Sequence, residues 1–137
     1  MKTIFFISLL VLSIRCTTTR NTSSNNAGLD GTWVPVKEEM GGSALPDAAF
    51  KNQQLSIKDS TYTVTAESVD KGVVRLNGDK MDIYGRNGVN AGKHFTALYK
   101  YEAGQLTICY NLAGDAYPES FDTQGKPLYF LSVFKRK

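Results

Sequence analysis

A chain of 137 residues fits one domain once its N-terminal segment is set aside. Hydrophobic residues make up 42% and charged residues 21%, a balance that excludes intrinsic disorder as the main state. The formal net charge is +3 and the body of the chain has no Lys/Arg cluster, which argues against a nucleic-acid-binding protein.

The first residues have the pattern of an export signal. A charged start, Met1-Lys2-Thr3, precedes an apolar run over 4–14 that is interrupted by two serines. A run of about 11 residues is too short to span a bilayer, which takes roughly 20, but it suits a secretory signal. We therefore expect residues 1–15 to be a signal peptide.

The end of this segment, 12–16 (LSIRC), resembles a bacterial lipobox, in which the Cys receives a lipid. Residues 16–28 are rich in Thr, Ser and Asn, a composition that suits a flexible tether. Arg15 departs from the lipobox pattern, which prefers a small residue before the Cys. Two locations stay open: a cell-envelope protein anchored to the membrane through Cys16 and facing the periplasm or the cell exterior, or a secreted protein.

From residue 29 onward, short segments alternate apolar and polar residues and are separated by turn residues. A period of two is the pattern of β-strands, and the Asn77-Gly78 pair is typical of a hairpin turn. Strands are predicted over 33–38, 54–58, 62–66, 73–76, 81–84, 95–101, 106–111 and 128–136. The longer connections are a 40–52 loop with one helical turn, a glycine-rich 85–92 loop and a long 112–127 loop.

Eight such strands predict an all-β domain over 29–137, an eight-stranded antiparallel up-and-down β-barrel, because closure removes both exposed sheet edges. An open β-sandwich is the alternative. The Gly31-Thr32-Trp33 opening, with Arg136 near the end of the last strand, resembles the lipocalin and wider calycin barrels. The resemblance implies that Gly31 and Trp33 begin the first strand and that the Arg136 guanidinium covers the indole, closing the barrel.

The 29–137 segment also resembles a bacterial lipocalin-like domain family that is abundant in planctomycetes. The features that carry this resemblance, in order, are 31–33 (GTW), 106–110 (LTICY), 118–121 (PESF) and 134–136 (FKR). Position 117 is Tyr where the family often has Arg, so no role of that Arg is transferred. The family has no settled activity, and the resemblance therefore implies a fold rather than a function.

The sequence offers no set of catalytic residues. His94 is the single histidine, and no Cys or carboxylate stands at a spacing that would complete a zinc site around it. Cys109 lies in a strand pattern and is expected to be a small core hydrophobe. No Gly-X-Ser-X-Gly elbow occurs, and 85–94 departs from the phosphate-binding loop pattern. We expect a non-enzymatic protein without a cofactor or metal.

Aromatic side chains are the group with functional promise. Five strand tyrosines are candidates for lining a ligand-binding interior: Tyr62, Tyr84, Tyr99, Tyr101 and Tyr110. An eight-stranded barrel holds packed side chains or one small ligand, and this many rings favour a largely filled interior. We expect an envelope protein that binds a small apolar or amphipathic molecule in the barrel or at its mouth. An interior without a pocket above roughly 300 Å³ would count against that function.

A protein-binding module, or an inhibitor of an envelope enzyme, is the alternative function. The 112–127 loop would then be the binding element. Its aromatic residues Tyr117 and Phe121 would supply the anchors that a protein partner recognises.

Overall fold

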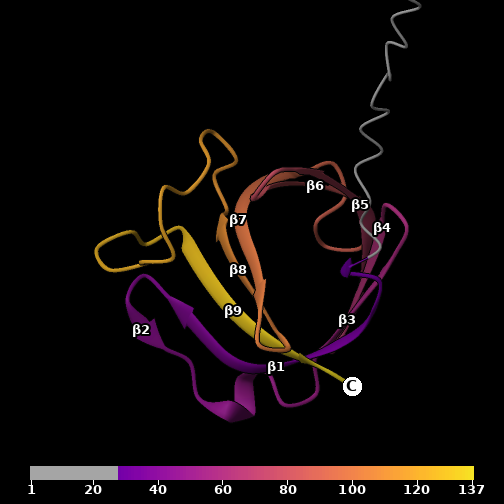
Figure 1. Cartoon of the computed structure of the whole chain (residues 1–137), viewed down its shortest axis with the longest axis horizontal. Helices are drawn as coiled ribbons and strands as arrows, with labels where there is room; N and C mark the ends of the chain where they lie inside the picture. The colour runs from indigo at the N-terminus through magenta and orange to yellow at the C-terminus, as the bar shows by residue number, and fades with distance from the viewer. Residues whose placement is uncertain (1–27) are drawn as a thin grey trace, which may run out of the picture.

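The computed structural model describes residues 28–137; the predicted signal peptide and Cys16 lie outside the described residues. The described chain is built from strands, with one 3₁₀ turn (Figure 1). Its elements are β1 (Gly31–Met40), β2 (Ser43–Ala44), η2 (Asp47–Ala49), β3 (Gln54–Lys58), β4 (Thr61–Thr65), β5 (Val69–Asn77), β6 (Lys80–Asn87), β7 (His94–Glu102), β8 (Gln105–Asn111) and β9 (Tyr129–Arg136).

The strands close into a barrel. The sheet order is β2-β1-β3-β4-β5-β6-β7-β8-β9, every pairing is antiparallel, and β1 pairs in addition with β9. The two-residue β2 pairs with the end of β1, so the barrel itself has eight strands. The β1–β9 seam runs from Trp33 opposite Arg136 to Met40 opposite Phe130. The predicted up-and-down barrel is confirmed, and the open sandwich was the wrong alternative.

Two strands extend further than the alternation pattern predicts. β5 begins four residues before position 73, and β6 continues into the glycine-rich segment that was expected to be a loop. Gly72 lies opposite Gly85 beside a β-bulge, and a Cβ on either residue would collide with nearby backbone. Glycine weakens a strand signal in the sequence, although here its missing side chain is what allows the backbones to approach.

A β-bulge in β1 changes which residues face the interior. The register against β9 passes from Pro35 opposite Phe134 to Lys37 opposite Val133, which leaves Val36 as the extra residue. Strict alternation from the buried Trp33 would point Lys37 inward. Because one residue is inserted, Glu38 turns inward instead and is 3% exposed.

Trp33 and Arg136 close one end of the barrel. Their positions near the start of the first strand and the end of the last strand predicted this pair. The indole is fully buried, and its Nε1 donates a hydrogen bond to the Leu29 carbonyl oxygen at 2.9 Å. The Arg136 guanidinium lies 4.4 Å from the centre of the Trp33 ring and donates to the carbonyl oxygens of Asp30 and Gly28. We call this the closed end.

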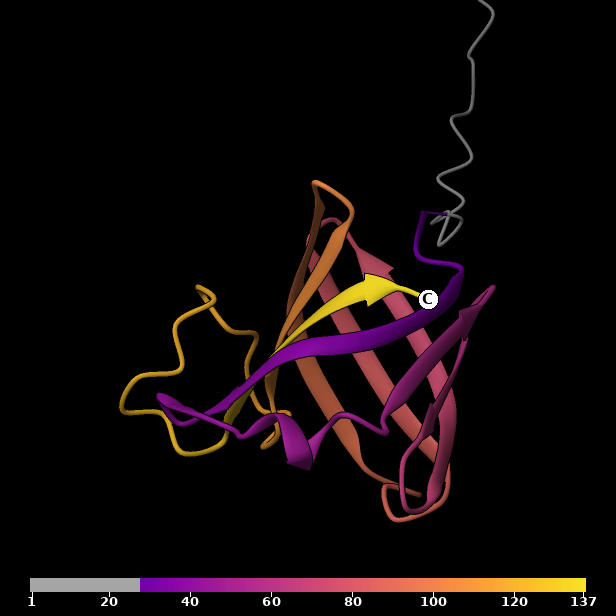
Figure 2. The ribbon, with the colours of Figure 1, turned by 90° about the horizontal axis from the view of Figure 1, so that it is seen from below.

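The hairpin connections are divided between the two ends of the barrel. Figure 2 shows the β5–β6 and β7–β8 hairpins at one end and the β4–β5 and β6–β7 connections at the other. The 112–127 loop extends to one side of the barrel, next to the end of β1 (Figures 1 and 2). No helix in the described part of the chain is long and apolar enough to cross a membrane.

Candidate ligand-binding site

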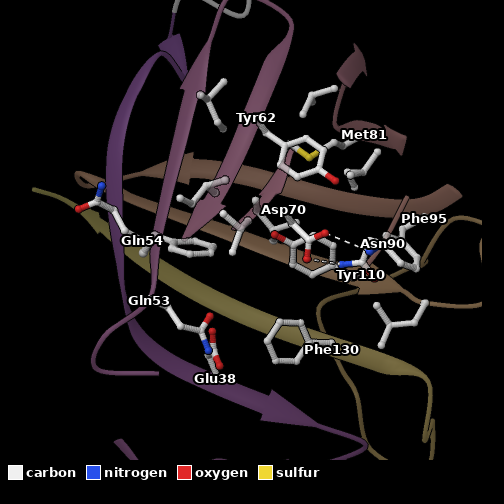
Figure 3. A pocket seen from close by; sticks show the side chains of 18 residues that line it. Glu38, Gln53, Gln54, Tyr62, Asp70, Met81, Asn90, Phe95, Tyr110 and Phe130 are labelled. Atoms are coloured by element: carbon white, nitrogen blue, oxygen red, sulfur yellow. Dashed lines mark hydrogen bonds between the residues drawn. The ribbon is translucent and has the colours of Figure 1, made fainter. Parts of the chain in front are cut away.

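A cavity of about 180 Å³ lies inside the barrel (Figure 3), and its lining includes Glu38, Asp70 and Asn90 from the end of the barrel away from Trp33. We call this the open end; there β1 and β8 finish while β5 and β7 begin. Apolar side chains from seven strands form most of the wall: Leu55, Ile57, Val64, Val74, Met81, Ile83, Phe95, Ile108, Phe130 and Phe134. A wall of this kind, with a few polar groups, is typical of sites for small molecules.

Glu38 places a carboxyl group on the cavity wall. Its Oε1 accepts a 3.3 Å hydrogen bond from the Ser132 hydroxyl, which lies directly opposite on β9. Burial raises the pKa of Glu38 from 4.5 to about 7, and the Ser132 hydrogen bond offsets part of that rise. The carboxyl group is therefore poised to change its charge near neutral pH.

Asp70 is the second acidic residue of the lining, and its carboxylate is well satisfied. Oδ1 accepts a hydrogen bond from the backbone N–H of Asn90, and Oδ2 accepts one from the Asn90 side chain, both at 3.0 Å. These bonds hold the β6–β7 loop against the start of β5, as the dashed lines in Figure 3 show. Asp70 therefore positions Asn90 at the cavity, whereas Glu38 has weaker support.

Two of the five predicted tyrosines, Tyr62 and Tyr110, line the cavity. The Tyr62 side chain is 6% exposed, and Figure 3 shows it reaching into the pocket from β4. Burial raises the pKa of both hydroxyl groups, and the nearby charge of Asp70 adds to the rise at Tyr62. Within residues 28–137, neither hydroxyl has a protein hydrogen-bond partner, and both belong to residues that line the cavity, so both are available to a ligand.

The other three predicted tyrosines lie outside the cavity. Tyr84 is on the outer face of β6, stacked on His94 with ring centres 4.5 Å apart. Tyr99 points inward nearer the closed end and donates a hydrogen bond to the Gly78 carbonyl oxygen. Tyr101 packs edge-on against Trp33 and is 44% exposed. The sequence correctly placed these tyrosines on strands. Whether each side chain points into the barrel, and near which end it lies, depends on the strand register, which the sequence did not show.

The size of the cavity limits what it can hold. At about 180 Å³ it falls below the roughly 300 Å³ set as the criterion from the sequence, which counts against a ligand of the usual drug size. It is comparable to an engineered protein cavity of about 150 Å³ that binds benzene. Trp33 and Leu106 are fully buried near the closed end, and the cavity has room for one ring or a short alkyl chain.

Two aromatic side chains of the 112–127 loop contact the outside of the barrel. The Tyr117 hydroxyl donates to Asp82 Oδ2 at 2.7 Å, and His94 Nε2 lies 2.7 Å from the other oxygen of that carboxylate. Phe121 lies beneath the Lys100 ammonium, 5.1 Å from ring centre to nitrogen. Both aromatic residues of the predicted protein-binding element therefore have contacts within this chain.

Cys109 is fully buried, but on the outer face of β8 rather than in the barrel core. Its neighbour Tyr110 faces the cavity, so the alternation of the strand points the thiol away from it. Burial raises the pKa of this thiol to about 11. The prediction of a small buried hydrophobe is confirmed, and the structure adds that the 112–127 loop buries this residue from outside the barrel.

Sequence reasoning missed Glu38 and Asp70. Pro35 was the available signal for Glu38, because a proline within a strand marks an edge or a bulge. Asp70 fell before the predicted start of its strand, in a segment for which the sequence predicted no element. Among the described residues, no group of three or more His, Cys, Asp or Glu side chains could hold a metal ion.

Comparison with known proteins gives no further guide to the ligand. No protein-family model matches the chain, and no curated protein matches its sequence. The functional argument therefore depends on the geometry and chemistry of the cavity.

Proposed function

We propose that this protein is a non-enzymatic, lipocalin-like binding protein of the cell envelope that holds a small apolar or amphipathic molecule at the open end of its barrel. The observation that carries the proposal is the cavity of about 180 Å³, with its mainly apolar wall. Burial of apolar surface contributes roughly 25 cal/mol for each Å² removed from water, which favours an apolar ligand.

The volume narrows the ligand to a single ring, a short alkyl chain, or the end of a larger molecule whose remainder stays outside. Exposed apolar side chains stand at the edge of the open end, which we call the rim, and they would contact the part of the ligand that stays outside. Val69 and Val89 are 48% and 68% exposed, and Gly88 packs against the Val69 backbone, which places both valines on the same part of the rim. An apolar segment that leaves the cavity would lie over these side chains.

Binding of hexan-1-ol tests the proposal, because its six-carbon chain suits the cavity and it carries no charge. Titration of isotope-labelled protein should shift the NMR signals of Ile83, Ile108 and Val74 in the cavity wall. Val64→Phe places a ring inside the cavity and should abolish these shifts. Thr63→Phe, the neighbouring outward-facing position, is the matched control and should preserve them. Unchanged wall signals in the wild type would refute the proposal.

The envelope location has a separate test. Mass spectrometry of the mature protein should find diacylglycerol attached to an N-terminal Cys16 if the lipobox is used. An unmodified mature N-terminus at any other residue would exclude the anchor and favour secretion.

A further inference from the structure

The cavity is lined by acidic groups without basic ones. Glu38 on β1 and Asp70 on β5 are both lining residues, and the lining contains no Lys, Arg or His. Lys93 donates a hydrogen bond to one lining residue from the exposed loop: its ammonium lies 3.3 Å from Asn90 Oδ1. A ligand in the cavity therefore meets negative charge on two sides, which disfavours an anion.

Two polar groups on the same wall lack a partner. The Tyr62 side chain is more than nine-tenths buried, and its hydroxyl is aimed into the cavity (Figure 3). Glu38 is buried to the same degree, and its Oε2 has no hydrogen bond from the described part of the chain. Neither oxygen is sealed in the core: within residues 28–137, Asp30 Oδ1 is the buried side-chain oxygen that lacks a partner, so the Tyr62 hydroxyl and Glu38 Oε2 face the open cavity, where a ligand's donors would reach them.

Aromatic rings surround the same space. Tyr62, Phe95, Tyr110 and Phe130 belong to four different strands and all line the cavity. Tyr110 and Phe130 lie directly opposite each other on β8 and β9, with ring centres 5.7 Å apart. The face of an aromatic ring attracts a cation, and several rings around a carboxylate make a site for an ammonium group.

We propose that the bound molecule carries a protonated amine, which pairs with the Glu38 carboxylate among these rings while its short apolar part fills the cavity. The inference rests on the proposed function and specifies the class of ligand. The amine supplies the donor that Glu38 Oε2 lacks. Moving a charged ammonium group from water into the cavity costs free energy. The Glu38 carboxylate offsets this cost, because it provides an opposite charge inside the cavity.

Amine binding is expected to depend on pH. The titratable groups that face Glu38 across the cavity are Tyr62 on β4, Asp70 on β5 and Tyr110 on β8. With a pKa of about 7, Glu38 is neutral in mildly acid solution and must release one proton to the solvent when it pairs with an ammonium. Affinity for the amine should therefore be lower at pH 5.5 than at pH 8.

Isothermal titration with three six-carbon probes tests the inference on the whole mature protein: hexylamine, hexan-1-ol and hexanoate. At pH 8 we expect hexylamine to bind at least tenfold more tightly than hexan-1-ol, and hexanoate to bind weakest. Glu38→Gln should reduce the preference for the amine to less than threefold. Glu39→Gln is the matched control, because Glu39 points outward and contacts Thr123, and it should keep the preference.

The outcomes separate this inference from the proposed function. Equal affinity for amine and alcohol, a preference for hexanoate, or an amine preference that survives Glu38→Gln would each overturn the amine inference and leave the proposed function intact. Failure of all three probes to bind would overturn both. An amine preference that is lost in Glu38→Gln and kept in Glu39→Gln supports the inference.

Discussion

The closed and open ends of the barrel differ in how their polar side chains are satisfied. At the closed end, Trp33 Nε1 and the Arg136 guanidinium each donate to backbone carbonyl oxygens of the segment that precedes β1, although Asp30 Oδ1 in that segment is buried without a hydrogen-bond partner. At the open end, the hydroxyl groups of Tyr62 and Tyr110 have no partner within residues 28–137, and Glu38 has one hydrogen bond at 3.3 Å.

This difference separates the part of the barrel that provides stability from the part available for binding. The Tyr62 and Tyr110 hydroxyl groups and Glu38 Oε2 face the cavity without a protein partner, and proteins tend to retain such groups where a ligand or a reaction uses them. A barrel built for stability alone would have an apolar residue in place of Glu38. The comparison therefore predicts that substitutions at the closed end destabilise the fold, while several at the open end are neutral or stabilising.

Trp33→Ala should have the largest effect. The indole is fully buried, and replacing a buried Trp by Ala typically costs about 3–5 kcal/mol in the free energy of unfolding. Urea denaturation monitored by circular dichroism measures the loss. Leu128→Ala, at a side chain that is 53% exposed, is the control and should change stability by less than about 0.5 kcal/mol. Equal losses in the two variants would mean that the closed end does not stabilise the barrel.

Asp70→Ala should come next, because Asp70 is the well-satisfied carboxylate of the open end. It removes two hydrogen bonds from Asn90, and bonds to a charged group contribute about 1.5–3 kcal/mol each at most. We expect a loss of about 2 kcal/mol and faster amide hydrogen exchange in the β6–β7 loop. Asp70→Asn keeps one acceptor and should lose less. Unchanged exchange in Asp70→Ala would show that the loop is held by other contacts.

Glu38→Gln should increase the free energy of unfolding above neutral pH, whereas the two preceding substitutions lower it. The folded-state pKa of Glu38 is raised, so the native state binds the proton more tightly than the unfolded chain does. Wild-type stability should fall as the pH rises from about 4.5 to about 7 and then level off. Glu38→Gln removes this dependence and should be more stable at pH 8 by about 1–3 kcal/mol, since water in the open cavity screens part of the effect.

Urea denaturation curves of the wild type and Glu38→Gln at pH 5 and pH 8 measure whether the substitution raises the free energy of unfolding. Glu39→Gln, on the neighbouring outward-facing residue, serves as the control and should retain the wild-type pH dependence. If Glu38→Gln were less stable than the wild type at pH 8, the Glu38 carboxylate would have a stabilising partner in the folded protein, and the contrast between the two ends would be lost.

The barrel itself could be predicted because its signals are local and repeat along the chain. Alternation, hairpin turns and the Trp33–Arg136 pair each follow from residue type and position. The cavity could not be predicted in the same way, because which face of a strand points inward depends on bulges. One extra residue, Val36, determines that Glu38 rather than Lys37 faces the interior.

The buried contacts between the 112–127 loop and the outside of the barrel could not be predicted from the sequence either. Cys109 and Thr123 are both fully buried, yet neither lies in the barrel core. The burial comes from a loop whose path depends on long-range contacts, such as the Thr123 hydroxyl with Glu39 and with the Gly42 backbone N–H. Local patterns carry no information about such contacts, so a strand with two buried faces looks like any other strand.

Two Tyr→Phe substitutions give the smallest and most direct comparison of the two ends. The Tyr99 hydroxyl donates to the Gly78 carbonyl oxygen at 2.9 Å, so Tyr99→Phe should cost about 0.5–1 kcal/mol in the free energy of unfolding. Tyr110 lies on the adjacent strand without a protein partner, so Tyr110→Phe should change stability by less than about 0.5 kcal/mol. A larger loss in Tyr110→Phe than in Tyr99→Phe would show that the open-end hydroxyl is already satisfied in the free protein, and it would remove the reason to assign that group to a ligand.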